Sequence, residues 1–172
     1  MPYNPQINLQ VGDGKSINAA TLNYLAPTSF KLSIDRLTYP NTEYNIQTVA
    51  MPSMIVDGAQ ASYKTRNLQM TGDKVNYGQL TVVFLVDEEM QNYREIHDWI
   101  IGNVTNEDAP RDGKVRDLTL SILSSHNNVT KEIVFVDAFP IDLGSLPFDI
   151  QATDIEYLTA TVTFQYSYFK FV

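Results

Sequence analysis

Apolar and polar residues alternate along several short stretches of this chain, with the period of two that is typical of β-strands with one buried face. The alternation predicts strands over residues 29–35, 44–49, 80–86, 118–122, 133–136 and 158–168. Asn127-Asn128 supplies a hairpin turn between two of them. Many short strands with turns at regular intervals predict a mainly β fold, an antiparallel β-sandwich or small barrel.

One stretch has the spacing of a helix instead. Apolar residues recur there at steps of three and four, namely Met90, Tyr93, Ile96, Trp99 and Ile100. Asp87 precedes them as a good N-cap, and Gly102 closes the pattern. We therefore predict one α-helix, over about residues 88–101, that flanks the sheet.

Two segments carry apolar residues that suggest contact with a partner. The stretch from Met51 to Met70 is too irregular for a core strand, and exposed apolar residues on an extended arm usually mark an interface. The C-terminal strand has aromatic residues on both faces, so it is covered on both sides, either by its own fold or by a neighbouring subunit. The predicted contact residues are Met54, Ile55, Val56, Tyr63, Leu68, Tyr168 and Phe169.

The N-terminal residues differ in composition from the rest. Residues 1–28 are polar and interrupted by proline and glycine, which predicts an N-terminal arm ahead of one β-domain over residues 29–172. No apolar run is long enough for a signal peptide or a membrane-spanning helix, so neither is expected. We expect a protein made and used in a cytoplasm, or one that leaves the cell by lysis.

Composition and charge exclude several kinds of functional site. The chain has no cysteine, which excludes disulfides, zinc-thiolate sites, iron–sulfur clusters and a thiol nucleophile. The net charge is −8, from 12 basic and 20 acidic residues. This charge argues against a protein that grips nucleic acid by its phosphates, because such a grip needs a cationic surface.

The remaining motifs do not combine into a catalytic or metal site. Gly14-Lys15-Ser16 resembles the end of a phosphate-binding loop, but Leu9 stands where that loop needs another glycine. His97 and His126 lie on different elements, without the spacing of metal ligands. No Gly-x-Ser-x-Gly elbow is present, and the paired carboxylates stand in polar contexts. We expect no catalytic residue, no metal and no cofactor, and therefore not an enzyme.

A set of short strings occurs in a fixed order along residues 29–170. The first strings are Asn67-Leu68-Gln69-Met70-Thr71-Gly72-Asp73, Tyr77, Leu80-Thr81-Val82, Asp87-Glu88 and Asp98-Trp99. The later ones are Val129-Thr130-Lys131-Glu132-Ile133, Phe139-Pro140, Leu143-Gly144, Asp149 and Tyr166-Ser167-Tyr168-Phe169. Taken together, this collinear set resembles the tail tube protein of contractile-tailed bacteriophages.

The resemblance implies a small antiparallel β-sandwich or barrel with a flanking helix, a fold shared with the ring protein of type VI secretion systems. It implies a structural virion protein whose subunits form hexameric rings that stack into the inner tail tube. The implied partners are other copies of the chain, the tail sheath protein, and the baseplate and tail-terminator proteins. DNA would pass through the lumen during ejection without specific binding, which the acidic balance favours. The implied location is the virion tail, assembled in the host bacterial cytoplasm.

Several alternatives to a repeating tube subunit stay open. A baseplate tube initiator or a tube terminator would share the fold. A protein of a different class, a small-ligand or sugar-binding β-barrel, would use Trp99 and the tyrosines to line a pocket. A hydrolase with an unrecognised triad is a further alternative, which no spacing in the sequence supports.

Overall fold

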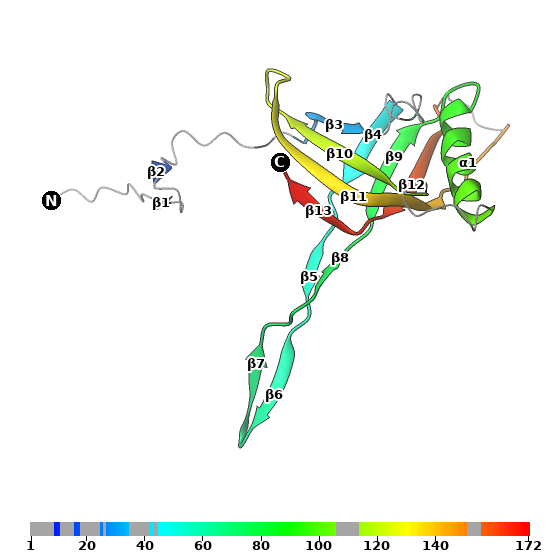
Figure 1. The fold of residues 1–172 in the computed structure, drawn as a ribbon. Helices are drawn as coiled ribbons and strands as arrows, with labels where there is room; N and C mark the ends of the chain where they lie inside the picture. The colour runs from blue at the N-terminus through cyan, green and yellow to red at the C-terminus, as the bar shows by residue number, and fades with distance from the viewer. Residues whose placement is uncertain are drawn as a thin grey trace.

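One curved antiparallel sheet forms the body of the molecule (Figure 1). The computed structural model describes residues 9–10, 16–17, 25, 27–34, 42, 45–105, 114–150 and 156–172. The order of strands in the sheet is β3 (Phe30–Ser33), β10 (Arg116–Leu123), β11 (Val129–Leu143), β12 (Thr159–Gln165), β9 (Leu80–Leu85) and β4 (Ile46–Ala50), and β13 (Tyr168–Phe171) pairs with β11 outside this path. Every neighbouring pair is antiparallel. The predicted fold class is therefore confirmed.

The long strand β11 makes the corner of the sheet. Its first part pairs with β10 and β13, and its last part pairs with β12. The change of partner falls at Asp137, whose φ of 56° lies in the left-handed region. The backbone N–H of Asp137 donates to Asp117 (3.1 Å), and the Ser167 hydroxyl donates to the Asp137 carboxylate (3.1 Å). These bonds hold a bulge at which the sheet turns.

The core lies inside this curved sheet and beneath the helix. Phe84, Phe135 and Phe164 are fully buried there, on strands whose inward and outward residues alternate as predicted. The helix α1 (Gln91–Thr105) packs against β11 and buries Ile96 and Trp99. The indole N–H of Trp99 donates to the backbone oxygen of Lys114 (3.1 Å), and its ring lies 5.9 Å from that of Phe164.

The helix begins and ends at residues other than those predicted. It begins at Gln91, because Asp87 and Met90 close a separate turn and Met90 has a left-handed φ of 54°, which a right-handed helix cannot include. Asp87 still caps it, accepting the backbone N–H of Asn92 (3.2 Å). The helix continues past Gly102 to Thr105.

Two further predictions about strands were wrong in detail. The expected final strand over 158–168 is divided into β12 and β13, because the Ser167 N–H donates to the Val136 oxygen where the chain crosses from one part of β11 to the other. The strand expected over residues 133–136 is longer than predicted, because β11 runs from Val129 to Leu143. The turn at Asn127-Asn128 is confirmed, and Asn127 has the left-handed φ (59°) that such a turn uses.

Most of the predicted N-terminal arm, residues 1–28, lies outside the described residues. Within it, β1 (Leu9–Gln10) and β2 (Ser16–Ile17) pair as a short antiparallel ladder. In the part of the chain that the structure describes, no helix has the length and apolar character needed to cross a membrane.

Candidate assembly surface

A long hairpin leaves the body between β4 and β9 and projects away from it (Figure 1). Its inner ladder pairs β5 (Met54–Val56) with β8 (Val75–Tyr77). Its outer ladder pairs β6 (Ala59–Tyr63) with β7 (Arg66–Met70). We refer to residues 54–77 as the arm.

The predicted contact residues of this region all lie on the arm. Met54, Ile55, Val56 and Leu68 each expose between 51% and 57% of their surface. Tyr63 is the last residue of β6 and pairs with Arg66 in the register, and its side chain lies outside the described part of the structure. The arm also exposes two apolar residues that the sequence interpretation missed, Met70 and Val75.

The outer ladder of the arm has one apolar and one polar face. Directly opposed residues of an antiparallel pair share a face. One face therefore holds Ala59 opposite Met70 and Ala61 opposite Leu68, with Arg66 at its outer end. The other face holds Gln60 opposite Gln69 and Ser62 opposite Asn67. An isolated two-stranded hairpin is marginally stable in water, so an apolar face of this kind calls for a partner.

A joint separates the two ladders of the arm. Val56 pairs with Val75 and Ala59 with Met70, which leaves two residues on one limb against four on the other. A Cβ at Gly72 would lie 1.7 Å from the backbone oxygen of Asp57, so only glycine fits this close approach. The amide of Asn76 donates to the Asp57 carboxylate (2.7 Å) and ties the two limbs together beside the joint.

The root of the arm is fixed by an aromatic cluster. The ring of Tyr77 lies 5.4 Å from Phe169 and 6.0 Å from Tyr166. Phe169, half-buried, also packs against Phe135 (5.7 Å), so its inner face is covered by its own fold. Tyr168 points to the other side of β13 and is 44% exposed. The predicted contact residues Tyr168 and Phe169 are therefore placed differently: Phe169 supports the arm, and Tyr168 faces out.

The Tyr166 hydroxyl in this cluster is buried and has no hydrogen-bond partner among the described residues. Burial raises the pKa of Tyr166 to about 12, with a smaller contribution from the nearby Tyr77. The phenol therefore stays neutral over the whole physiological range.

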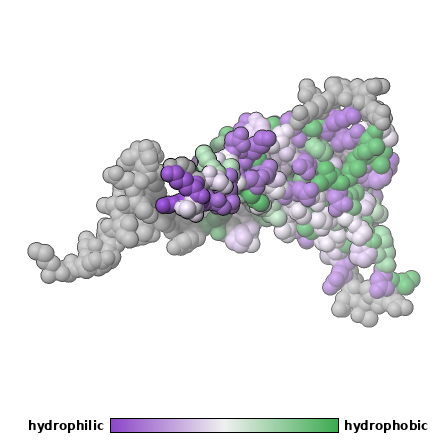
Figure 2. Space-filling model, turned by 90° about the horizontal axis from the view of Figure 1, so that it is seen from below, coloured by the Kyte–Doolittle hydropathy of each residue, from purple (hydrophilic) through white to green (hydrophobic). Residues whose placement is uncertain are grey.

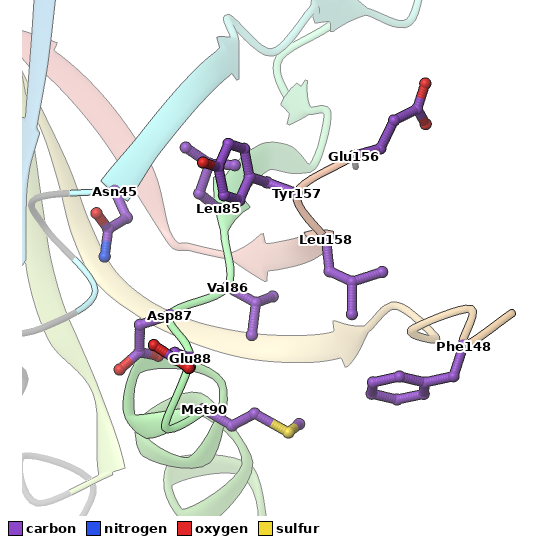
Figure 3. Close-up of a pocket in the computed structure, with 10 residues that line it drawn as sticks. All are labelled: Asn45, Leu85, Val86, Asp87, Glu88, Met90, Phe148, Glu156, Tyr157 and Leu158. Carbon is purple, nitrogen blue, oxygen red and sulfur yellow. The ribbon is translucent and has the colours of Figure 1, made fainter. Parts of the chain in front are cut away.

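A second surface feature lies at the far end of β9, away from the arm. A pocket of about 700 Å³ opens between the turn before α1 and the segment leading into β12. Figure 3 shows Val86, Met90, Phe148 and Leu158 around one space, with Glu88, in the turn before α1, beside them. Asn45, Leu85, Asp87, Glu156 and Tyr157 complete the lining.

Local bonds hold the walls of this pocket in place. The Val86 N–H donates to the Leu158 oxygen (2.9 Å), and the buried Asn92 amide donates to the Leu85 oxygen (2.6 Å). Phe148 and Tyr157 stand at its mouth, 74% and 80% exposed. Figure 2 shows hydrophobic surface at this end of the body, the end that carries α1. The sequence interpretation did not find the pocket, because its lining comes from segments that lie far apart in the chain.

The residues considered for chemistry are not gathered into a site. His97 is exposed on the outer face of α1, where its ring nitrogen lies 3.0 Å from Asp98. This hydrogen bond and the nearby Arg94 hold the pKa of Asp98 below its usual value. His126 lies in the β10–β11 turn. Among the described residues, no group of three or more His, Asp or Glu side chains is placed to hold a metal ion.

The fold is that of the tube proteins of contractile injection systems. A chain in the structure of the anti-feeding prophage cap, a tube-terminating cap, matches with a TM-score of 0.68 and 14% identity, over 91% of this chain and 95% of that chain. A chain in the sheath–tube complex of the extracellular contractile injection system PVC, in the extended state, matches with a TM-score of 0.66 and 17% identity, over 89% of this chain and 94% of that chain.

One curated protein is also similar in sequence. Over 156 residues the chain is 26% identical to the tail tube terminator protein of Enterobacteria phage T4, covering 86% of this chain and 89% of that protein. No family model matches the sequence. The predicted resemblance to the tail tube family of contractile phages is confirmed.

The comparisons bear on the alternatives. None of these similar proteins is a sugar-binding protein by name. Trp99, expected to line a pocket in such a protein, is buried against Phe164 and lines neither of the two described pockets. The ligand-binding alternative therefore has no support.

Proposed function

We propose that this protein is a structural subunit that ends the inner tube of a contractile tail, a tube terminator. The sequence interpretation favoured a repeating tube subunit and kept the terminator as an alternative. The observation that favours the terminator is the similarity to the tail tube terminator of phage T4, which extends over 86% of this chain and 89% of that protein. Similarity along nearly the whole length of both chains supports a common architecture.

The two roles differ in what the subunit surfaces must do. A repeating subunit needs complementary surfaces on both faces of its ring, because rings stack without limit. A terminator needs a surface for the last ring of the tube and no surface that accepts a further tube ring. In both roles the arm is a contact surface, because its apolar side chains are exposed in the single chain.

The wider assembly follows from the same proposal. Six copies form a ring, the ring meets the tube and the sheath, and the tail includes a baseplate at its other end. DNA leaving the capsid passes through the ring. A chain with a net charge of −8 suits this passage, because acidic walls repel phosphates. The protein then resides in the virion tail and is assembled in the cytoplasm of the host.

Negative-stain electron microscopy of the purified chain tests the proposal. We expect closed rings that do not grow into tubes, and we expect the chain to shorten the tubes when it is added to polymerising tube protein from the same phage. Long tubes formed by this chain alone would identify it as the repeating subunit instead. A strict monomer at high concentration that leaves tube length unchanged would overturn both roles.

The repeating subunit remains the second candidate for one reason. The TM-score to the chain from the sheath–tube complex, 0.66, nearly equals that to the chain from the terminating cap, 0.68. The fold therefore fits both roles, and the terminator is preferred on sequence similarity.

A further inference from the structure

The arm leaves one end of the body, and the pocket beside α1 lies at the other end. β9 begins at Leu80, three residues after the arm ends at Tyr77, and its last residue, Leu85, lies in the pocket wall. Six residues of extended strand span about 20 Å. Since the arm projects in the other direction, it cannot cover the pocket of its own chain (Figure 1).

The outer ladder of the arm is basic in an acidic protein. Between Gly58 and Gly72 the chain has Lys64 and Arg66 and no acidic residue, whereas the whole chain has a net charge of −8. Figure 2, seen from the side toward which the arm points, shows a hydrophilic tip. Arg66 lies on the apolar face, in line with Leu68 and Met70, and no described residue forms an ion pair with it.

The pocket has the complementary character. Asp87, Glu88 and Glu156 line it together with apolar residues, and no basic residue does. Asp87 is engaged in capping α1, whereas no described residue pairs with Glu88 or Glu156. Glu156 extends outward from the rim, so its carboxylate is within reach of an incoming side chain (Figure 3).

We propose that the outer ladder of the arm of one copy docks in this pocket of an adjacent copy. Leu68 and Met70 cover the apolar lining, and Arg66 meets Glu88 or Glu156. The inference rests on the proposed function in one respect, since it requires neighbours of this fold. Because the two surfaces are different, the contact is heterologous, and it closes when the copies are arranged in a ring.

Other occupants of the arm's apolar face fit less well. A contact between two arms would bring the Arg66 side chains of both copies together, and like charges oppose it. The exposed surface of β13 has Lys170 between Phe169 and Phe171, which is the same sign of charge as the arm. The described pocket near β3 is lined by apolar residues, proline and serine and has no carboxylate for Arg66.

Charge reversal tests the pairing. Arg66→Glu should weaken self-association about tenfold in sedimentation velocity, and Glu88→Arg or Glu156→Arg should do the same. Arg66→Glu combined with one of these two should return the association to within about threefold of the wild type. Gln69→Glu is the matched control, because it adds a carboxylate to the polar face of the same ladder. If neither combination restores association, the pairing is wrong.

Engineered cysteines give an independent readout, because the chain has none of its own. Leu68→Cys with Tyr157→Cys should give disulfide-linked oligomers on oxidation, and Leu68→Cys with Phe171→Cys should not. Efficient dimers of Leu68→Cys alone would show an arm-to-arm contact and overturn the proposal. Wild-type rings that cap tubes, with no rescue and no Leu68–Tyr157 cross-link, would overturn the docking and leave the terminator role intact. A wild-type chain that neither associates nor caps tubes would overturn both.

Discussion

Glutamates at Met54 and Ile55 are expected to separate assembly from folding. Both residues lie on the inner ladder of the arm, outside the core cluster, and expose 54% and 57% of their surface. Met54 pairs with Tyr77 and Ile55 with Asn76, so the two side chains point to opposite faces of the arm. The double variant Met54→Glu, Ile55→Glu therefore places a charge on each face.

The exposed fractions of Met54 and Ile55 set the size of the expected losses in folding stability and in association. Full burial of such a side chain stabilises by about 1.5–3 kcal/mol. Less than half of that is realised in the single chain, so the free energy of unfolding should fall by at most about 3 kcal/mol for the pair. A neighbour that covers the other half gains about 2 kcal/mol, and a carboxylate in a closed contact costs at least 1 kcal/mol more. A loss of about 3 kcal/mol weakens association on the order of 100-fold.

Two measurements on the same protein separate the effects. Urea unfolding followed by circular dichroism measures the stability of the body. Sedimentation velocity with electron microscopy measures the formation of rings. Gln69→Glu, on the polar face of the outer ladder, controls for added charge. A fall in unfolding free energy of about 4 kcal/mol or more would show that the inner ladder belongs to the core. Rings of normal affinity would show that the inner ladder is not an interface.

Three other substitutions probe the body and the joint. Phe164→Ala removes a fully buried ring and should lower the unfolding free energy by about 3–5 kcal/mol in urea; a loss below about 1 kcal/mol would contradict the assigned core. Tyr166→Phe should be neutral or stabilising by about 1 kcal/mol, because no described residue hydrogen-bonds the buried hydroxyl. Burial raises the pKa of Tyr166 to about 12 against an ordinary value of 10.0, so the folded state holds the phenol proton more tightly than the unfolded state. Wild type should therefore lose stability relative to Tyr166→Phe as the pH rises from about 10 to about 12, and a constant difference between the two unfolding free energies over this range would refute the assignment. Gly72→Ala should distort the arm without changing the melting temperature of the barrel, with amide NMR shifts confined to residues 54–77; widespread shifts would contradict the independence of arm and body.

The sequence predicts those parts of the fold that local patterns determine. The alternation along β9 and β12 is visible in the chain because each strand has one buried face. The bend in β11 is not, because the left-handed Asp137 is held by Asp117 and Ser167, which lie 20 and 30 residues away in the chain. The continuation of the arm from Met70 to Tyr77 was not predicted for a related reason. In the sequence, the residues around Gly72 look like a turn that ends the arm, whereas in the structure they form a joint between its two ladders.

The candidate assembly surface was also predictable from the sequence only in part. The exposed residues of the arm were predictable, because runs of apolar residues in an irregular context are a local signal. The pocket beside α1 was not, because its lining comes from Asn45, residues 85–88, Met90, Phe148 and residues 156–158. No periodic pattern links these segments, and the pairing of β9 with β12 and β4 and of β12 with β11 brings them together.

The root of the arm meets the C-terminal strand at one place in the structure. Tyr77 ends the arm and packs on Phe169. The residue before Phe169 in β13, Tyr168, faces outward. The aromatic cluster also fixes the direction of the arm relative to β13, since Tyr166 and Phe135 hold Phe169 from behind. The root of the arm is thus fixed on β13, and the joint at Gly72 marks where the outer ladder begins.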